Sequence, residues 1–165
     1  MISAPTPLGD PHDLDGFVSG VASLDDWLKR RARANQASDA SRTFVIAQGA
    51  AVIGYYCLAA GAIGRADAPK NLQRNRPDPL PVMVLGRLAI HQDHQQRGIG
   101  TALLQDAMLR TLHAAEQVGM TALMVHALSE EARRFYLSRG FLASPVQAMT
   151  LFLPMATLRR GLGMV

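Results

Sequence analysis

The order of the β-rich runs, helical patterns and glycine breaks predicts an α/β fold, with a mixed β-sheet that carries helices on both faces. Two observations support this prediction. A pair of β-rich runs meets at a short turn near the start of the chain, as in a hairpin. Strands and helices then alternate, and a strand–helix–strand unit needs a crossover that places its two strands parallel. The length fits one domain, residues 1–165, without repeats or an internal boundary.

The first predicted elements are a helix and a hairpin. A loose Ser-x-x-Asp capping box before an apolar stripe predicts a helix from about Leu24 to Ala37. The box is Ser23–Asp26, and the stripe is Leu24, Trp27 and Leu28. The runs Arg42–Gln48 and Ala51–Ala62 are rich in strand-forming residues and are joined at Gly49, which predicts the hairpin.

A long proline-rich loop separates the hairpin from the alternating elements. Loops of this length in compact domains are usually functional or mobile. A helix that Ser129 starts and Gly140 stops is the clearest of the later elements. The predicted order is loop Gly64–Pro81, strand Val82–Ile90, helix Gly98–Val118, strand Thr121–Leu128, helix Glu130–Arg139 and strand Met149–Leu153.

The positive charge of the chain is concentrated in short segments. The net charge is +4, and 15 of the 17 basic residues are arginine. Arginine suits bidentate contacts with phosphate, although a GC-rich genome produces the same bias. Five basic residues fall within 14 positions that contain a single acid, Asp39: Lys29, Arg30, Arg31, Arg33 and Arg42. This clustering favours a polyanionic partner.

Several classes of protein are disfavoured. No apolar run approaches the roughly 20 residues that a membrane span needs, and the N-terminus lacks the pattern of a signal peptide, so we expect a cytoplasmic protein without membrane contact. The single cysteine, Cys57, is expected to be a small buried hydrophobe. The five histidines lack metal-site spacing, so no metal is expected. Trp27 is expected to anchor the core and not to stack on a base.

The stretch from Val84 to Leu104 carries the chemistry. A strand runs into a turn with the pattern Gln95-x-x-Gly98-x-Gly100, and a helix follows. Glycines let the backbone approach a ligand closely, and the first amides of a helix are unpaired donors at its positive end. Together these features predict a binding site for a pyrophosphate.

A second pattern lies 35 residues further on, where Phe135, Tyr136, Gly140 and Phe141 form Phe-Tyr-x-x-x-Gly-Phe. With both patterns, the chain resembles the GCN5-related N-acetyltransferase (GNAT) superfamily over nearly its whole length. The resemblance implies a mixed, mostly antiparallel sheet and acetyl-CoA as co-substrate. It implies that Tyr136 lies near the thioester sulfur as general acid. The coenzyme-binding residues that it implies are Leu88 and Ile90, through their backbone, and Gln95, Gln96, Arg97, Gly98, Gly100 and Thr101.

Further segments resemble one subfamily, the GNAT toxins of bacterial type II toxin–antitoxin modules. These segments are Gly20–Leu28, Asn35–Gln36, Ala40–Val45 and Leu85–Ile90. The resemblance implies acetylation of the α-amino group of aminoacyl-tRNA, which blocks translation. It also implies a ribbon-helix-helix antitoxin, and operator DNA reached only through that antitoxin. The expected tRNA face is Lys29, Arg30, Arg33, Arg42, Arg74 and Arg76. Whether the chain forms a homodimer stays open.

The strand Val82–Ile90 contains no Asp or Glu that could serve as a base. A lysine side chain, with a pKa of about 10.4, needs a base to become nucleophilic, whereas an α-amino group, at about 7.7–8.0, is substantially neutral without one. This absence favours an α-amine acceptor, with His91 or an ordered water as the alternative base. Two other functions stay open: acetylation of a small amine or protein N-terminus, and a regulatory subunit that acts through the antitoxin–DNA complex.

Overall fold

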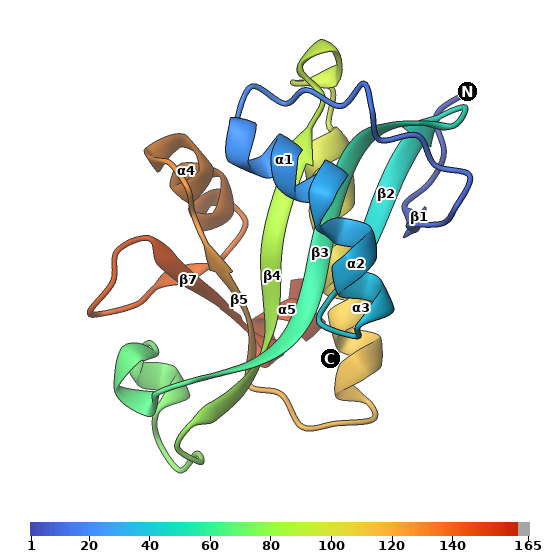
Figure 1. Ribbon diagram of the computed structural model, residues 1–165. Helices are drawn as coiled ribbons and strands as arrows, with labels where there is room; N and C mark the ends of the chain where they lie inside the picture. The colour runs from blue at the N-terminus through green and yellow to red at the C-terminus, as the bar shows by residue number, and fades with distance from the viewer. Residues whose placement is uncertain (162–165) are drawn as a thin grey trace. The chain divides into compact units, whose positions relative to one another are not determined.

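The computed structural model describes residues 1–161 and divides the chain into two compact units. Residues 1–59 and 86–107 form the first unit, and residues 60–85 together with those from 108 onward form the second. Strands β3 (Ala51–Ile63) and β4 (Leu80–Ile90) contribute to both units. The strand order of the sheet is β1-β2-β3-β4-β5-β7-β6, with parallel and antiparallel neighbours, which confirms the predicted mixed sheet (Figure 1).

The first unit is built around the predicted hairpin. Strand β2 (Arg42–Gln48) pairs antiparallel with β3, and the short β1 (Thr6–Pro7) pairs with β2 at the edge. Gly49 has φ +62°, a left-handed conformation that favours glycine in a two-residue hairpin turn. The hairpin is therefore confirmed, whereas strand β1 had no signal in the sequence.

Helices cover both faces of this hairpin, as predicted. Successive residues of a strand point to opposite faces. The Tyr55 hydroxyl donates to the carbonyl oxygen of Leu24 at 2.7 Å, in α1 (Ala22–Arg30), whereas the Tyr56 hydroxyl donates to Asp106 in α3 (Ile99–Ala115). Helices α1 and α2 (Ala32–Ala37) lie across β2 and β3 in Figure 1. The buried cluster under them is Leu8, Leu14, Phe17, Leu24, Leu28, Ala32, Val45, Val52, Tyr55 and Ala89.

The prediction of one capped helix over 24–37 is wrong in two respects. The helix breaks at Arg31, whose φ of −121° separates α1 from α2. The cap is also different, because α1 begins at Ala22 and Ser23 already lies inside its first turn. Asp25 reaches back instead and accepts hydrogen bonds from the backbone N–H and the hydroxyl of Ser19, at 3.0 and 2.6 Å.

The second unit contains the parallel pair of the sheet. Residues Val82–Leu85 of β4 pair parallel with β5 (Ala122–His126), as the crossover through α3 predicts. Strand β7 (Thr150–Pro154) pairs with β5, but antiparallel. The prediction that the strands before and after α4 lie parallel is therefore wrong for β5 and β7. The short strand β6 (Leu142–Ala143) lies between α4 and β7, and the chain reverses direction once more between β6 and β7.

Helix α4 (Glu130–Ser138) has the predicted start, since the Ser129 hydroxyl accepts from the N–H of Ala132 at 3.0 Å. A helix that was not predicted, α5 (Met155–Gly161), follows β7. The proline-rich loop contains two 3-10 turns, Arg65–Asp67 and Lys70–Leu72. Its apolar residues join the buried cluster of this unit, which comprises Ala68, Leu72, Leu80, Val82, Ala122, Met124 and Phe152.

Candidate functional site

The turn between β4 and α3 is held in place by the Gln95 side chain. Its amide nitrogen donates to the carbonyl oxygen of Ser19 at 2.8 Å and to that of Ile90 at 3.0 Å. These bonds tie the turn to the end of β4 and to the segment that precedes α1. Gln95 was predicted to bind the coenzyme, and its hydrogen bonds indicate that it acts by shaping the turn.

The two glycines of the turn have different local roles. Gly98 has φ +83°, so its backbone conformation itself favours glycine, and the preceding Gln96 is also left-handed at φ +62°. Gly100 does not have a positive φ, and a methyl group added there would meet no atom within 4 Å. The fold therefore does not require glycine at position 100. The open space above this position leaves room for a bound group to approach the backbone.

The start of α3 supplies donors for an anion. The first four N–H groups of an α-helix have no partner inside the helix, and the helix dipole is positive at this end. The first helical hydrogen bond of α3 runs from the N–H of Ala102 to the carbonyl oxygen of Gly98, at 3.0 Å. The position over Gly100 therefore fits a pyrophosphate, which a helix N-terminus binds readily.

The half of β4 that precedes this turn presents partly exposed residues. Leu88 and Ile90, the two predicted pantetheine contacts, are half-buried, and Gly86 is exposed. A methyl group on Gly86 would lie 2.9 Å from the sulfur of Cys57, so glycine is required there by the neighbouring strand. Cys57 itself is buried as predicted, and burial raises the pKa of its thiol, which makes it a poor nucleophile.

His91 is engaged on both ring nitrogens. Its Nδ1 accepts a hydrogen bond from the N–H of Asp93 at 3.1 Å, and its Nε2 lies 3.2 Å from the carbonyl oxygen of Gly16. Since a carbonyl only accepts, the proton must be on Nε2 and the lone pair on Nδ1 is already used. The tautomer that satisfies both contacts leaves no basic nitrogen available. The alternative that His91 serves as the base is therefore disfavoured by the geometry.

Tyr136 sits at the C-terminal end of α4 in a Schellman motif. The N–H of Phe141 donates to the carbonyl oxygen of Tyr136 at 3.3 Å, and the N–H of Gly140 donates to that of Leu137 at 3.2 Å. Gly140 has φ +98°, as this motif requires. The motif brings the rings of Tyr136 and Phe141 to 5.3 Å between centroids. The Phe-Tyr-x-x-x-Gly-Phe pattern is thus explained locally as a helix end with its hydrophobic contact.

The Tyr136 phenol is held in its protonated form. The residue is 5% exposed, and burial raises the pKa of its phenol above the ordinary value. Its hydroxyl makes no hydrogen bond to any residue within 1–161. A protonated hydroxyl without a protein partner can donate to a bound group.

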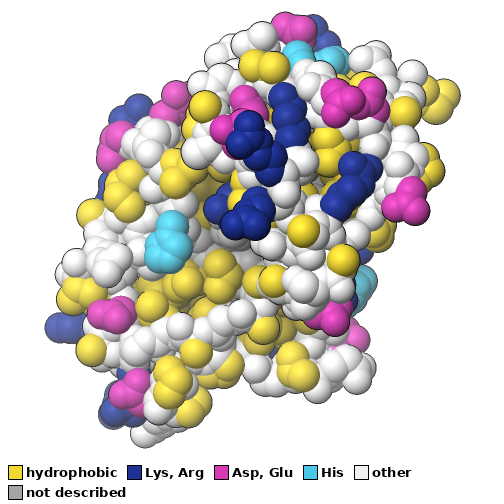
Figure 2. All heavy atoms as spheres, in the orientation of Figure 1, with side chains coloured by type: hydrophobic (Ala, Val, Ile, Leu, Met, Phe, Trp, Pro, Cys, Tyr) yellow, Lys and Arg dark blue, Asp and Glu magenta, His cyan; other side chains and the backbone are white. Residues whose placement is uncertain are grey.

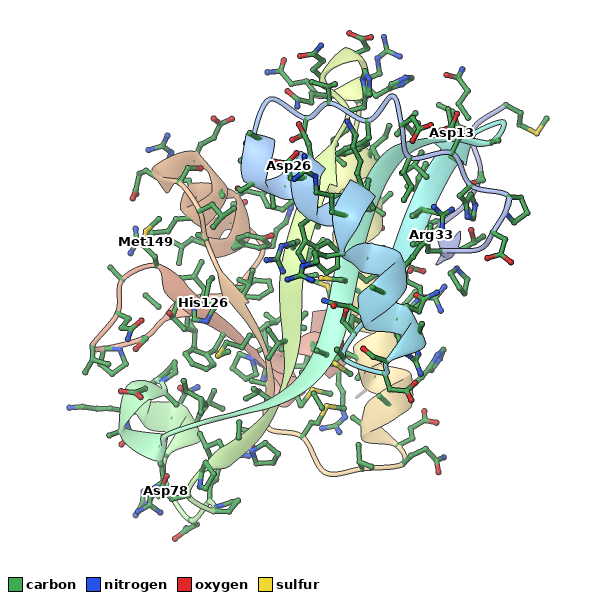
Figure 3. The ribbon with its side chains drawn as sticks, in the orientation of Figure 1. Asp13, Asp26, Arg33, Asp78, His126 and Met149 are labelled. Atoms are coloured by element: carbon green, nitrogen blue, oxygen red, sulfur yellow. The ribbon has the colours of Figure 1, made fainter. Side chains whose placement is uncertain are left out.

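The basic residues of the predicted tRNA face differ in what they contact. Lys29 and Arg30 are exposed at the end of α1. Arg33 donates to the carbonyl oxygens of Gly9 and His12, at 3.2 and 2.7 Å, and so holds the N-terminal segment (Figure 3). Arg42 forms an ion pair with Asp39 at 2.7 Å. Basic side chains gather over α1 and α2 in Figure 2. Arg74 and Arg76 are exposed and belong to the second unit.

Trp27 and Arg87 form a stack that the sequence did not indicate. The Trp27 ring stacks on Tyr55 with centroids 6.0 Å apart, and the Arg87 guanidinium lies 4.5 Å from its centroid. The core role expected for Trp27 is confirmed by its packing against the buried cluster of the first unit. Arg87 adds a positive charge beside the basic end of α1, and only the fold brings it there.

No three His, Cys, Asp or Glu residues within 1–161 are grouped so as to hold a metal ion. Within the same residues, no helix has the length and apolar character needed to cross a membrane.

Comparison with known proteins places this geometry in a family. A family model described as an acetyltransferase (GNAT) domain matches residues 39–142. The chain is 45% identical over 161 residues to the tRNA-acetylating toxin of Mycobacterium tuberculosis (strain ATCC 25618 / H37Rv), covering 98% of this chain and 97% of that protein.

Solved structures agree with this match. AtaT complexed with acetyl-methionyl-tRNAfMet superposes with a TM-score of 0.89 at 29% identity, covering 98% of this chain and 99% of AtaT. A mutant AtaT toxin bound to the C-terminus of the antitoxin AtaR and to acetyl-CoA gives a TM-score of 0.83 at 27% identity, covering 98% of each chain. The family model includes both the Gln95–Thr101 turn and Tyr136. The chain therefore belongs to the GNAT acetyltransferase superfamily.

Proposed function

We propose that this protein is the toxin of a type II toxin–antitoxin module that transfers the acetyl group of acetyl-CoA to the α-amino group of aminoacyl-tRNA. The observation that carries the proposal is the 45% identity, over nearly the whole of both chains, with a tRNA-acetylating toxin. Acetylation blocks the amine that would form the next peptide bond, so translation stops. The place of action is the cytoplasm, where charged tRNA is used.

Acetyl-CoA is bound by the turn that opens α3 and by the end of β4. The amides that follow Gly98 face the pyrophosphate, and the open space above Gly100 admits it. The backbone of Leu88 and Ile90 pairs with the pantetheine arm. The remaining residues of this site are Gln95, which shapes the turn, Gln96, Arg97 and Thr101.

Tyr136 completes the reaction as general acid. Attack of the amine on the thioester expels a thiolate, which needs a proton. The phenol of Tyr136 carries its proton at neutral pH, since the ordinary pKa of a phenol lies above neutral pH and burial raises the pKa of this one further, and its hydroxyl has no competing partner within residues 1–161.

The tRNA phosphates contact the basic face that begins with Lys29 and Arg30 on α1. The proposed face also includes Arg33, Arg42, Arg74 and Arg76. We propose further that a ribbon-helix-helix antitoxin silences the toxin and that operator DNA is reached only through that complex. Structures of the similar toxin AtaT with the C-terminus of the antitoxin AtaR, and of KacTA with DNA, support this part of the proposal. Residues 1–165 act as one catalytic domain.

The test is a translation extract supplied with labelled acetyl-CoA and the purified protein. We expect the label on charged tRNA. When the ester bond to the tRNA is then cleaved, the label should remain on the released N-acetyl amino acid. We also expect translation to stop. Label on a small amine or on a protein N-terminus, with translation intact, would contradict the proposal. If the extract shows neither a labelled product nor an arrest of translation, a regulatory role is favoured instead.

A further inference from the structure

A short segment of the chain, residues 16–19, lies beside the turn that follows β4 (Figure 1). Three hydrogen bonds join the two, and in each of them the turn donates to a backbone carbonyl oxygen of the segment. The donor and acceptor pairs are Nε2 of His91 with Gly16 at 3.2 Å, the N–H of Gln92 with Val18 at 2.8 Å, and Nε2 of Gln95 with Ser19 at 2.8 Å. The segment and the turn both belong to the first unit.

The segment is anchored on its other side. Asp25 of α1 is buried and accepts hydrogen bonds from the N–H and the hydroxyl of Ser19, at 3.0 and 2.6 Å. The Phe17 ring is 1% exposed and contacts the Tyr55 ring edge to face, with centroids 5.5 Å apart. A buried polar network whose hydrogen bonds are satisfied favours one rigid arrangement. Residues 16–19 therefore form a fixed support for the turn.

His91 links this support to the backbone of the turn. Its Nδ1 accepts from the N–H of Asp93 at 3.1 Å, so the ring caps the 3-10 turn Gln92–His94. The N–H of His94 donates to the carbonyl oxygen of His91 at 2.8 Å and closes this turn. The His91 side chain is 17% exposed, and the Phe17 ring packs against it with centroids 6.1 Å apart. One imidazole thus bonds the support through one nitrogen and the turn through the other.

The residues that present donors to an anion follow this capped turn directly. Gln96 and Gly98 take left-handed conformations, with φ of +62° and +83°, and lead the backbone into the start of α3. The first N–H groups of that helix have no partner inside it. A backbone site binds an anion well when its N–H groups are already oriented before the anion arrives, because binding then needs no further ordering. A displacement of the turn at Gln92–His94 would move these donors together.

We propose that His91 is a positioning residue of the acetyl-CoA site, which holds the pyrophosphate-binding turn against residues 16–19 and takes no part in proton transfer. The inference rests on the proposed binding of the pyrophosphate at this turn. Both ring nitrogens are used, by the N–H of Asp93 and the carbonyl oxygen of Gly16. The ring therefore acts on binding, by keeping the turn in place in the free protein. Its loss should weaken coenzyme binding and leave the chemical step unchanged.

The experiment measures acetyl-CoA binding by calorimetry, and turnover with charged tRNA, for the full chain and three variants. His91→Ala removes both hydrogen bonds of the ring. In His91→Asn the side-chain oxygen can still accept from the N–H of Asp93, because asparagine is among the preferred capping residues, but the bond to Gly16 is lost. His12→Ala is the matched control. The His12 ring also accepts a backbone N–H on its Nδ1, that of Gly9 at 2.9 Å, and it makes no bond to the turn.

We expect His91→Ala to weaken acetyl-CoA binding by about threefold to thirtyfold, the range that corresponds to the loss of one capping hydrogen bond. The KM for acetyl-CoA should rise in parallel, and turnover at saturating acetyl-CoA should stay at the wild-type value. His91→Asn should recover part of the lost affinity. His12→Ala should lose stability as His91→Ala does and should keep the wild-type affinity for acetyl-CoA.

Four results would overturn the inference. They are an unchanged acetyl-CoA affinity in His91→Ala, a fall in its turnover without a rise in KM, an affinity of His91→Asn no better than that of His91→Ala, and an equal loss of affinity in His12→Ala. Hydrogen exchange of the free wild-type protein tests the cap even where a variant does not fold. The N–H of Asp93 should be protected, and exchange at the rate of an unprotected amide would contradict the proposal.

Failure of the proposed function gives a different result. Wild-type protein that binds no acetyl-CoA, or that binds it and acetylates no charged tRNA, would contradict the proposed function. In the second case the calorimetric comparison of His91→Ala, His91→Asn and His12→Ala still decides the role of His91, because it needs no acceptor. In the first case hydrogen exchange at Asp93 still tests whether the ring caps the turn.

Discussion

The turn that precedes α3 and the C-terminal end of α4 differ in which atoms they present: the turn presents backbone groups, and the helix end presents a side chain. At Gly100 the turn offers backbone groups with no side chain nearby, since an added methyl group would meet nothing within 4 Å. At Tyr136 the atom proposed to act as the general acid belongs to a buried ring that also forms the hydrophobic contact of a helix end. The first region can therefore lose function without losing stability. In the second region the ring stabilises the fold through its packing, and only the hydroxyl is available for catalysis.

The largest effect is expected in the second region, where two substitutions of Tyr136 separate the role of the hydroxyl from that of the ring. Tyr136→Phe keeps the ring and its contact with Phe141, so the free energy of unfolding should change by less than about 1 kcal/mol. Turnover should fall by about 10²–10⁴-fold, the usual contribution of a general acid. Tyr136→Ala should in addition destabilise the protein by about 3–5 kcal/mol, as loss of a buried aromatic does. Denaturation midpoints and turnover at saturating substrates measure the two effects, and near wild-type turnover of the Phe variant would remove Tyr136 from the mechanism.

The first region is tested with a pair of identical chemical changes. Gly100→Ala adds a methyl group to the first turn of α3 and should stabilise the protein by up to about 1 kcal/mol through helix propensity. It should weaken acetyl-CoA binding by about tenfold or more, because the methyl group occupies the space proposed for the pyrophosphate. Gly98→Ala is the control, since the positive φ there should make the same change destabilising by about 1–2 kcal/mol. Calorimetry with acetyl-CoA on both folded variants gives the affinities, and an unchanged affinity for Gly100→Ala would mean that the turn has a structural role alone.

The parts of the fold that the sequence predicted are those with local signals. The hairpin at Gly49 and the caps of α4 depend on residues within a few positions, and the structure confirms them. Strands β1 and β6 have two residues each and exist through pairing with distant segments. The direction of β7 was wrong for the same reason, since it depends on the reversal at β6.

The same division applies to the site. The Gln-x-x-Gly-x-Gly and Phe-Tyr-x-x-x-Gly-Phe patterns are contiguous and could be found in the sequence. The contact of His126 with Thr150 could not, because strand register brings these residues, 24 positions apart in the sequence, opposite each other. Arg33 is the opposite case. The sequence suggested that its guanidinium is available to a ligand, whereas in the structure it donates hydrogen bonds to the N-terminal segment. Side-chain partners across the sheet are set by tertiary structure, which composition and spacing do not contain.

The smallest expected effect extends the comparison to the basic end of α1, a third region where exposed side chains act through charge alone. Lys29→Ala/Arg30→Ala removes two exposed charges, whereas Arg33→Ala removes a charge whose guanidinium holds the carbonyl oxygens of Gly9 and His12. Removing one side chain that binds a phosphate should reduce the salt dependence of tRNA binding by about 0.7–0.9 in the slope of log K against log salt.

We therefore expect the double variant to raise the KM for charged tRNA and to flatten its salt dependence. Its acetyl-CoA affinity and its melting temperature should stay at wild-type values, because neither side chain has a partner within residues 1–161 that an alanine would remove. Arg33→Ala should show the converse pattern, with a stability loss of about 1 kcal/mol from the removal of its hydrogen bonds and a smaller change in the salt slope. Equal salt slopes for the double variant and the wild type would assign Lys29 and Arg30 to a solvated helix face. The tRNA contacts would then have to come from Arg74, Arg76 and the arginines of α5, Arg159 and Arg160.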